Sequence, residues 1–428
     1  MRYFVCFVIL VVGFGTIDAQ EFPISIATGD QINPDVAWDG TNFWVVWAGS
    51  GGVHGAKVTP QGQVDTVILF DYNGLMPAIA FGDSEGCVSF ITPGIEYYYD
   101  IKFCTFGSRG QIITSGTIPS YPSYQESYGW LFGSNKTPIS AFGRNNFFLF
   151  TRGWWDYPTE GWAGCRVFGV DDDTAINITP PYQWWYGHAL NLTGIWNSNK
   201  FLAVWTQNPC DTFVFGVVGA FVDDSLIEQG LDTLEFKIRG DEEFPSGIFH
   251  PWETRRGTEL AYSGSRYLLI SETGKEYHTT SKIWFDVLSD SGLPIDSLPT
   301  IIDNGDSVNQ TYPTCTYKDN KFYAVWQYSK ANWTYLYGIE VDTLGQIGFS
   351  SKLPGFSNKI QPSITTGGDK LFLVWADDRN GNFDIYGMLM DSLSIEESED
   401  TAYRVPTFLR CEPNPFIQKT IIEFRVKS

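Results

Sequence analysis

Clusters of aromatic residues stand in the predicted loops between strand-forming segments, and they are the residues best suited to bind a ligand. The flanking Gly, Pro, Asp and Ser residues mark these segments as loops. Exposed aromatic planes with polar tips offer a large rigid contact area at low entropic cost. Sugar rings stack on such planes, so the pattern predicts polysaccharide binding, with packing of the rings inside the fold as the alternative. The candidate ligand-binding residues are Trp154, Trp155, Tyr157, Trp162, Trp184, Trp185 and Tyr186.

Oxygen-bearing side chains also alternate around Gly381, where a tight turn could bring them together around Ca²⁺. The candidate metal ligands are Asp377, Asn380, Asn382 and Asp384. Their spacing is not that of an EF-hand loop, and Asp and Asn also cap turns by hydrogen-bonding their own backbone. Turn capping is therefore the favoured interpretation, and no other cofactor is predicted.

Motifs of familiar catalytic machinery are absent from the sequence. The four histidines are scattered, and there is no HExxH, no GxSxG and no phosphate-binding loop. A glycosidase pair could still lie among the 49 acidic residues, because such a pair is defined by separation in space and not by sequence spacing. The sequence assigns no catalytic residue, and a non-catalytic role is favoured.

The strongest signal is an internal repeat that must position all of these residues. An apolar stretch, a turn and a second apolar stretch recur, which predicts pairs of short antiparallel strands. Seven copies end at residues 47, 90, 151, 205, 271, 326 and 375, about 55 residues apart, and four of them end in Val-Trp. A third strand follows most pairs.

Units of this length suit the blades of a β-propeller, which bury their faces only by stacking on neighbours. We predict an all-β fold, a seven-bladed propeller, with six or eight blades as alternatives. Residues 24–33 match residues 301–309, the last strand before a new unit. The N-terminal strand is therefore predicted to complete the final blade and to hide its edge.

Two resemblances extend this interpretation. Residues 34–47 and 375–387 resemble an extracellular bacterial propeller-type repeat, and the last unit is similar to the repeats of periplasmic TolB. Residues 412–424, with Pro-Asn-Pro-Phe and a following Thr-x-Ile-x-Phe, resemble the start of a type IX secretion sorting domain. The first resemblance implies a fold and the second implies a bacterial protein that is secreted or held at the outer cell surface.

The remaining features predict the domain boundaries and the cellular location. Arg2 and an apolar run over residues 3–14 predict a signal peptide over residues 1–19. The apolar run is too short to span a membrane. The propeller is expected over 20–405, and an incomplete sorting-like segment over 406–428. Cys87 and Cys104 are predicted in neighbouring strands, either facing each other or as separate buried thiols.

The composition limits the classes of molecule that the protein is expected to bind. A net charge of −21 argues against a nucleic-acid binder, and 16% aromatic residues argue against disorder. We expect a monomer that binds a polysaccharide or a surface protein, without a transmembrane anchor in the mature chain. The favoured function is non-catalytic binding or scaffolding through the aromatic loops. The alternatives are a carbohydrate-active hydrolase or lyase with carboxylates near the propeller channel, and a structural surface-layer or matrix protein.

Overall fold

A computed structural model describes residues 21–93, 99–117, 139–143, 146–155, 162–169, 175–177, 188–208, 216–222, 235–240, 257–273, 281–302, 308–353, 355, 357–393, 408–412 and 421–425. The chain divides into two compact units, residues 1–393 and residues 394–428. Within the described residues, regular structure consists of strands, and no helix has the length and apolar character needed to cross a membrane.

The described strands of the first unit form seven four-stranded antiparallel sheets. Sheet 1 contains β2 (Ile32–Trp38), β3 (Phe43–Gly49), β4 (Gly52–Val58) and β5 (Val64–Asp71). Sheet 2 contains β6 (Leu75–Phe81), β7 (Glu85–Pro93), β8 (Tyr99–Gly107) and β9 (Ile112–Thr117). Sheet 3 contains β10 (Ile139–Gly143), β11 (Asn146–Trp155), β12 (Trp162–Gly169) and β13 (Ala175–Asn177).

The later repeats form the other four sheets. Sheet 4 contains β14 (His188–Trp196), β15 (Phe201–Asn208), β16 (Gly216–Val222) and β17 (Glu235–Gly240). Sheet 5 contains β18 (Thr258–Tyr262), β19 (Arg266–Thr273), β20 (Lys282–Ser289) and β21 (Thr300–Ile302). Sheet 6 contains β22 (Val308–Lys318), β23 (Lys321–Lys330), β24 (Trp333–Asp342) and β25 (Ile347–Lys352). Sheet 7 contains β26 (Lys359–Gly367), β27 (Lys370–Asp377), β28 (Asp384–Met390) and β1 (Glu21–Ser25).

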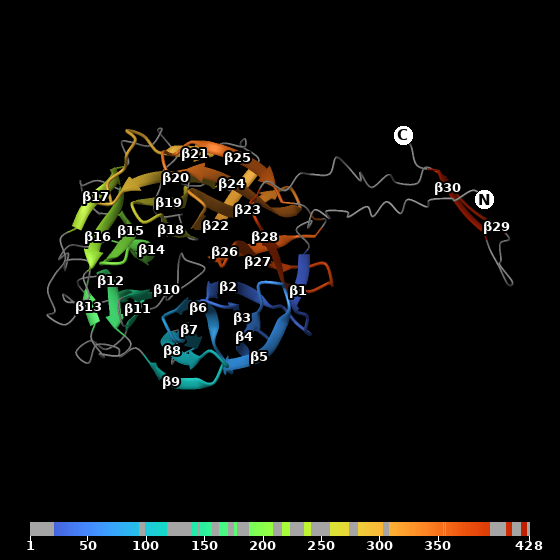
Figure 1. The fold of residues 1–428 in the computed structure, drawn as a ribbon, viewed down its shortest axis with the longest axis horizontal. Helices are drawn as coiled ribbons and strands as arrows, with labels where there is room; N and C mark the ends of the chain where they lie inside the picture. Colours follow the sequence, from blue (N-terminus) through green and yellow to red (C-terminus); the bar gives the residue numbers. More distant parts are fainter. Residues whose placement is uncertain are drawn as a thin grey trace, which may run out of the picture. The chain divides into compact units, whose positions relative to one another are not determined.

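The first strand of every sheet lies toward the middle of the unit, with the fourth strands at its periphery (Figure 1). Each first strand contacts the first strand of the next sheet, from β2 through β6, β10, β14, β18 and β22 to β26, and β26 in turn contacts β2. This arrangement of stacked four-stranded sheets is that of a β-propeller, as the repeat predicts.

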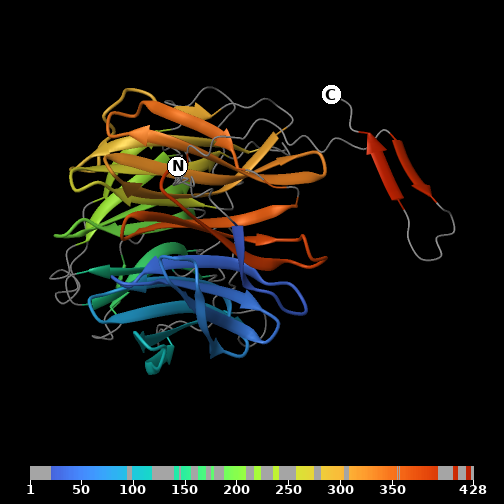
Figure 2. The same cartoon turned by 45° about the vertical axis from the view of Figure 1, so that its right-hand side comes forward.

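The last sheet takes its outer strand from the other end of the chain. β1 pairs antiparallel with β28, with Glu21 opposite Met388 and Pro23 opposite Tyr386. In Figure 2 the blue β1 lies beside the red-orange strands of sheet 7. The predicted exchange of an N-terminal strand is therefore present in the strand pairing.

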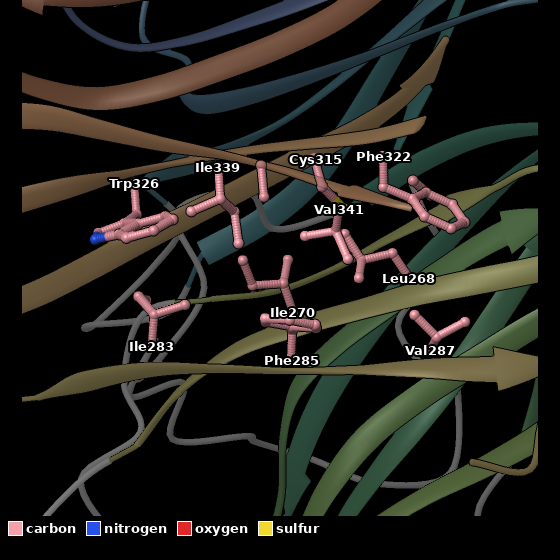
Figure 3. Packing of buried hydrophobic residues seen from close by; sticks show 12 residues of the cluster. Leu268, Ile270, Ile283, Phe285, Val287, Cys315, Phe322, Trp326, Ile339 and Val341 are labelled. Atoms are coloured by element: carbon pink, nitrogen blue, oxygen red, sulfur yellow. The ribbon is translucent and has the colours of Figure 1, made fainter. Parts of the chain in front are cut away.

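The repeated Val-Trp endings explain how the sheets pack. Trp47, Trp205, Trp326 and Trp375 are at most 1% exposed. Trp326 belongs to an apolar cluster with Ile270, Ile283 and Phe285, which joins sheets 5 and 6 (Figure 3). Alternate residues of a strand share a face, so each apolar stretch of the repeat supplies both faces of a sheet that is buried on both sides.

Register separates the two cysteines of sheet 2. Cys104 lies opposite Val88, whereas Cys87 lies opposite Thr105, so the two thiols are on opposite faces of the sheet. The option that they face each other across the hairpin is therefore wrong, and the buried-thiol alternative holds. Burial raises the pKa of the Cys104 thiol to about 11.

The second unit contains a two-stranded antiparallel sheet of β29 (Phe408–Glu412) and β30 (Ile421–Arg425), with Leu409 opposite Phe424. The residues that carry the sorting-domain resemblance contribute to both strands. The predicted signal peptide lies outside the described residues.

Candidate active site

Bulges near the beginning of the first strands shape the middle of the propeller. In sheets 1, 2, 6 and 7 the pairing shifts register at a residue that has positive φ and precedes proline. These residues are Asn33 (φ 53°), Met76 (49°), Tyr312 (61°) and Gln361 (54°), and Gly257 (145°) precedes Thr258 at the corresponding place in sheet 5. Bulges redirect side chains and are common next to active sites, so this region is a candidate position for the active site.

Polar side chains at these bulges link neighbouring sheets. The Asn33 backbone N–H donates to Gln361 Oε1 (2.8 Å), and the Gln361 N–H donates to Gln327 Oε1 (3.3 Å). Asp35 accepts hydrogen bonds from the Ile79 N–H (2.9 Å) and from Ser363 Oγ (2.8 Å). Asp35 thus holds sheets 7, 1 and 2 together, so we assign it a structural role.

Sheet 5 carries a pair of glutamates at the corresponding place. Glu259 lies opposite Ile270, as Asp35 lies opposite Val46 in sheet 1. Glu272 follows Ile270 by two positions, so it shares that face of the sheet and is a diagonal neighbour of Glu259. Diagonal Cβ atoms on adjacent antiparallel strands are about 7 to 8 Å apart. That spacing suits the carboxyl separations of glycosidase pairs, about 5 to 9.5 Å.

The face that carries both glutamates is turned toward sheet 6. Glu272 lies directly opposite Ile283, and Ile283 and Ile270 both pack in the cluster with Trp326 of β23. In Figure 3, Ile283 and Trp326 lie at one end of this cluster, with Val287 and Phe322 at the other. Glu272 is 2% exposed, and Glu259 is half-buried on the first strand.

A buried oxygen atom of sheet 6 stands at the same end of the interface. Gln310 is 0% exposed, and its amide nitrogen donates to the Ile302 carbonyl (2.9 Å). Gln310 Oε1 forms no hydrogen bond with the part of the chain that the structure describes. Buried polar atoms are normally satisfied, so such atoms mark a place for water or a ligand.

The predicted metal ligands form a hydrogen-bonded turn. Asp377 accepts hydrogen bonds from Trp375 Nε1 (2.9 Å) and Lys359 Nζ (3.2 Å), and it also binds the Arg379 side chain. Asp384 accepts from Gln31 (2.9 Å) and from the amides of the two asparagines. The amide nitrogens of Asn380 and Asn382 lie 2.8 and 3.1 Å from Asp384.

The Arg379 backbone N–H donates to Asp377 Oδ1 (3.0 Å), and the amide groups of Asn380 and Asn382 present nitrogen donors to Asp384. No group of three or more His, Cys, Asp or Glu residues suited to a metal occurs among the described residues. Calcium binding at this turn stays a prediction.

Asp377 gives a prediction for acid stability. Burial disfavours its charge, but the hydrogen bonds from Arg379 and Trp375 and the charge of Lys359 outweigh burial and hold its pKa well below the usual range. A lowered pKa stabilises the fold above the unfolded value of about 3.9, and this contribution is lost as the pH falls toward the folded value. Asp377→Asn should cost about 2 to 3 kcal/mol at pH 7, a difference that shrinks below about pH 4. Urea unfolding at a series of pH values measures this difference in the free energy of unfolding. Asp83→Asn, at an exposed position, serves as the control. A difference that stays constant with pH would contradict this account.

The predicted aromatic site lies largely outside the described side chains. Trp154 and Trp155 end β11 and Trp162 begins β12, with Trp155 opposite Trp162. These three residues therefore belong to strands and not to the predicted loop, because pairing continues to the end of the hairpin. Tyr157, Trp184, Trp185 and Tyr186 lie outside the described residues.

Comparison with known proteins gives no match to a family model and no match among curated proteins. Similar solved structures include the β-propeller domain of the trilobed protease from Pyrococcus furiosus (11% identity, 84% of this chain and 95% of that chain, TM-score 0.46). The arabinanase of Penicillium chrysogenum, complexed with arabinobiose, shares 13% identity over 76% of this chain and 94% of its own (TM-score 0.47). The arabinanase of Bacillus subtilis shares 12% identity over 86% and 96% (TM-score 0.34).

These comparisons correct the favoured function. Against the expectation of a non-catalytic scaffold, the similar structures include two arabinanases and an α-L-arabinofuranosidase from Fusarium graminearum. At these identities the likeness concerns the fold. The reaction of this chain has to be argued from its own residues.

The glutamate pair escaped prediction because its members stand on separate strands. Residue types alone do not distinguish Glu259 and Glu272 from the other acidic residues of the chain. Their shared face depends on the strand register, which in the other sheets is set by the bulge before each proline. The Asn33-Pro34 and Gln361-Pro362 pairs are the sequence signal for that bulge.

Proposed function

We propose that this protein is a glycoside hydrolase that cleaves a polysaccharide, with Glu259 and Glu272 as its catalytic carboxyl groups. The supporting observation is their diagonal arrangement on one face of β18 and β19, at the middle of the propeller. One carboxyl group protonates the glycosidic oxygen as the bond from the anomeric carbon breaks. The other removes a proton from the attacking water or attacks the anomeric carbon itself. Gln310 offers an oxygen atom that accepts a hydrogen bond from a sugar hydroxyl group.

Further proposals concern the whole molecule. The seven sheets act as seven blades of a propeller that β1 closes, a proposal supported by the pairing of β1 with β28 and by the contact between β26 and β2. The chain is exported as a monomer to the medium or the outer bacterial surface, which is supported by the signal-like and sorting-like segments of the sequence.

The test is release of reducing sugar from soluble arabinan, xylan, galactomannan and mixed-linkage glucan. The wild-type protein should degrade at least one polymer. Glu259→Gln and Glu272→Gln should each lower kcat by about 10² to 10⁴ fold, the usual contribution of a positioned acid or base. The variant that lacks the general acid should recover most on aryl glycosides with a good leaving group, because these need little protonation.

Glu85→Gln is the matched control, since Glu85 is a half-buried glutamate at the start of β7 in another sheet. It should keep wild-type kcat. Circular dichroism and urea unfolding of each variant separate lost chemistry from lost structure. Folded glutamine variants with wild-type kcat, or a wild-type protein inert on every polymer, would refute the assignment.

A further inference from the structure

The hairpin of β23 and β24 is longer than those of sheets 1 and 7. β23 continues for four residues beyond Trp326, whereas β3 and β27 continue for two residues beyond Trp47 and Trp375. At a rise of about 3.4 Å per residue, the hairpin of sheet 6 extends about 7 Å farther than those of sheets 1 and 7. Its tip is therefore placed to project beyond the hairpin tips of sheets 1 and 7.

One face of this hairpin carries five aromatic residues, which we call the aromatic stripe: Trp326, Tyr328, Trp333, Tyr335 and Tyr337. They share a face because Trp326 pairs with Tyr337 and Tyr328 with Tyr335, while Trp333 lies two positions before Tyr335. The ring of Tyr337 lies 5.2 Å from that of Trp326 and 5.7 Å from that of Tyr328.

Exposure rises along the aromatic stripe toward the tip of the hairpin. Trp326 is 0% exposed, the three tyrosines are half-buried, and Trp333 is 50% exposed. The stripe therefore begins in the core between sheets 5 and 6 and ends at the surface. Packing against neighbours explains the buried end, but it does not explain the large exposed ring of Trp333.

The inner part of the stripe adjoins the proposed catalytic glutamates. Tyr328 and Tyr337 pack against the cluster that contains Ile283, and Ile283 lies opposite Glu272. On β22, which pairs with β23, Gln310 lies opposite Tyr328. The stripe is thus continuous with the candidate active site.

Polar groups accompany the rings. Lys352 Nζ lies 3.3 Å from the centroid of the Tyr335 ring, and Lys330 lies opposite Trp333 on the same face of the hairpin. A sugar ring has apolar C–H faces and hydroxyl groups around its edge, so it matches planes bordered by donors and acceptors.

We propose that the aromatic stripe is a glycan-binding subsite that leads a polysaccharide chain from Trp333 toward Glu259 and Glu272. The direction of the chain rests on the proposed hydrolase function. Binding of the glycan at Trp333 does not require turnover.

The test is affinity electrophoresis in gels that contain arabinan, xylan, galactomannan or mixed-linkage glucan, with full-length protein carrying Glu272→Gln to prevent cleavage. At least one polymer should retard the protein. Trp333→Ala in this background should weaken that binding about five- to tenfold, as expected for loss of one stacked ring, and Trp333→Phe should retain most of it. Tyr72→Ala is the matched control because Tyr72 is 76% exposed on another sheet, and it should change nothing.

The outcomes separate the two proposals. Retardation by no polymer, or equal retardation of the Trp333→Ala and parent proteins, would overturn the subsite. Retardation that depends on Trp333, in a protein that releases no sugar before Glu272 is changed, would keep the subsite and reject the hydrolase. With an active enzyme, Trp333→Ala should raise KM for the polymer and leave kcat on a small aryl glycoside unchanged.

Discussion

A chain that begins after Ser25 is expected to lose most of the stability of its propeller unit. Ile24 of β1 is buried in the cluster that joins sheets 7 and 1, and the Phe22 ring stacks on Phe372 at 5.9 Å. Burial of two such side chains contributes about 3 to 6 kcal/mol. The truncation also takes Glu21 from Lys359, whose Nζ lies 2.7 Å away and which is 1% exposed. We expect a loss of about 5 kcal/mol or more.

The same truncation uncovers the edge of β28, whose unpaired backbone groups can bind another chain. Comparing the urea midpoint and light scattering of chains that begin at Gln20 and at Ile26 measures both effects. Ile26→Ser is the control, because Ile26 is 59% exposed just beyond β1. A peptide of residues 20–27, added to the shortened chain, should restore the midpoint, and the same peptide with Ile24→Asp should not. Equal midpoints for the two chains would refute a stabilising role for β1.

Asp286→Ala is expected to cost about 3 to 5 kcal/mol, because it leaves a guanidinium buried without its counter-ion. Arg239 of β17 and Asp286 of β20 join sheets 4 and 5, and both are 3% exposed. Arg239 Nε and Nη2 each lie 2.8 Å from a carboxylate oxygen of Asp286. Arg239 Nη2 also donates to the Asp296 carbonyl (2.7 Å), and Nη1 donates to the Ser297 carbonyl (2.9 Å).

An exposed ion pair provides the comparison. Lys57 and Asp65 are 3.1 Å apart, with side chains 22% and 54% exposed, and Asp65→Ala should cost less than about 1 kcal/mol. Replacing both Arg239 and Asp286 by leucine should destabilise less than either single change, since no charge is left buried alone. Urea unfolding of Asp286→Ala, Asp65→Ala, the double leucine variant and the single variants Arg239→Leu and Asp286→Leu measures these costs. A cost for Asp286→Ala no larger than that for Asp65→Ala would show that the buried pair contributes nothing special.

The repeat made the strands predictable because each apolar stretch has to bury two faces. The Val-Trp endings fall on the second strands of sheets 1, 4, 6 and 7, and the tryptophans pack between sheets. Where Ser271 replaces the tryptophan in sheet 5, the strand persists, and Ser271 Oγ lies 2.8 Å from Thr258 Oγ1. Local pattern therefore sufficed for the elements and for the exchange of β1.

Contacts between sheets were not predictable from the same pattern. Arg239 and Asp286 are 47 positions apart on different sheets, and nothing local pairs them. The glutamates of sheet 5 share a face only through the strand register, and a slip of one residue would put one of them on the other side. The aromatic stripe did leave a signal, because Trp333, Tyr335 and Tyr337 alternate with other residues at the period of a strand.

Because β1 pairs with β28, the first strand of the unit is made long before its partner strand during synthesis. Ala27, just after β1, hydrogen-bonds Asp384 at a distance of 357 positions along the chain. At about 5 to 20 residues per second, the ribosome needs roughly 20 to 70 s to make the stretch between them. Throughout that time the first strand has no partner in sheet 7, so it is an accessible target for chaperones and proteases. Sheet 7 therefore cannot be completed before β28 is made, whereas all strands of the other six sheets have been made by Lys352.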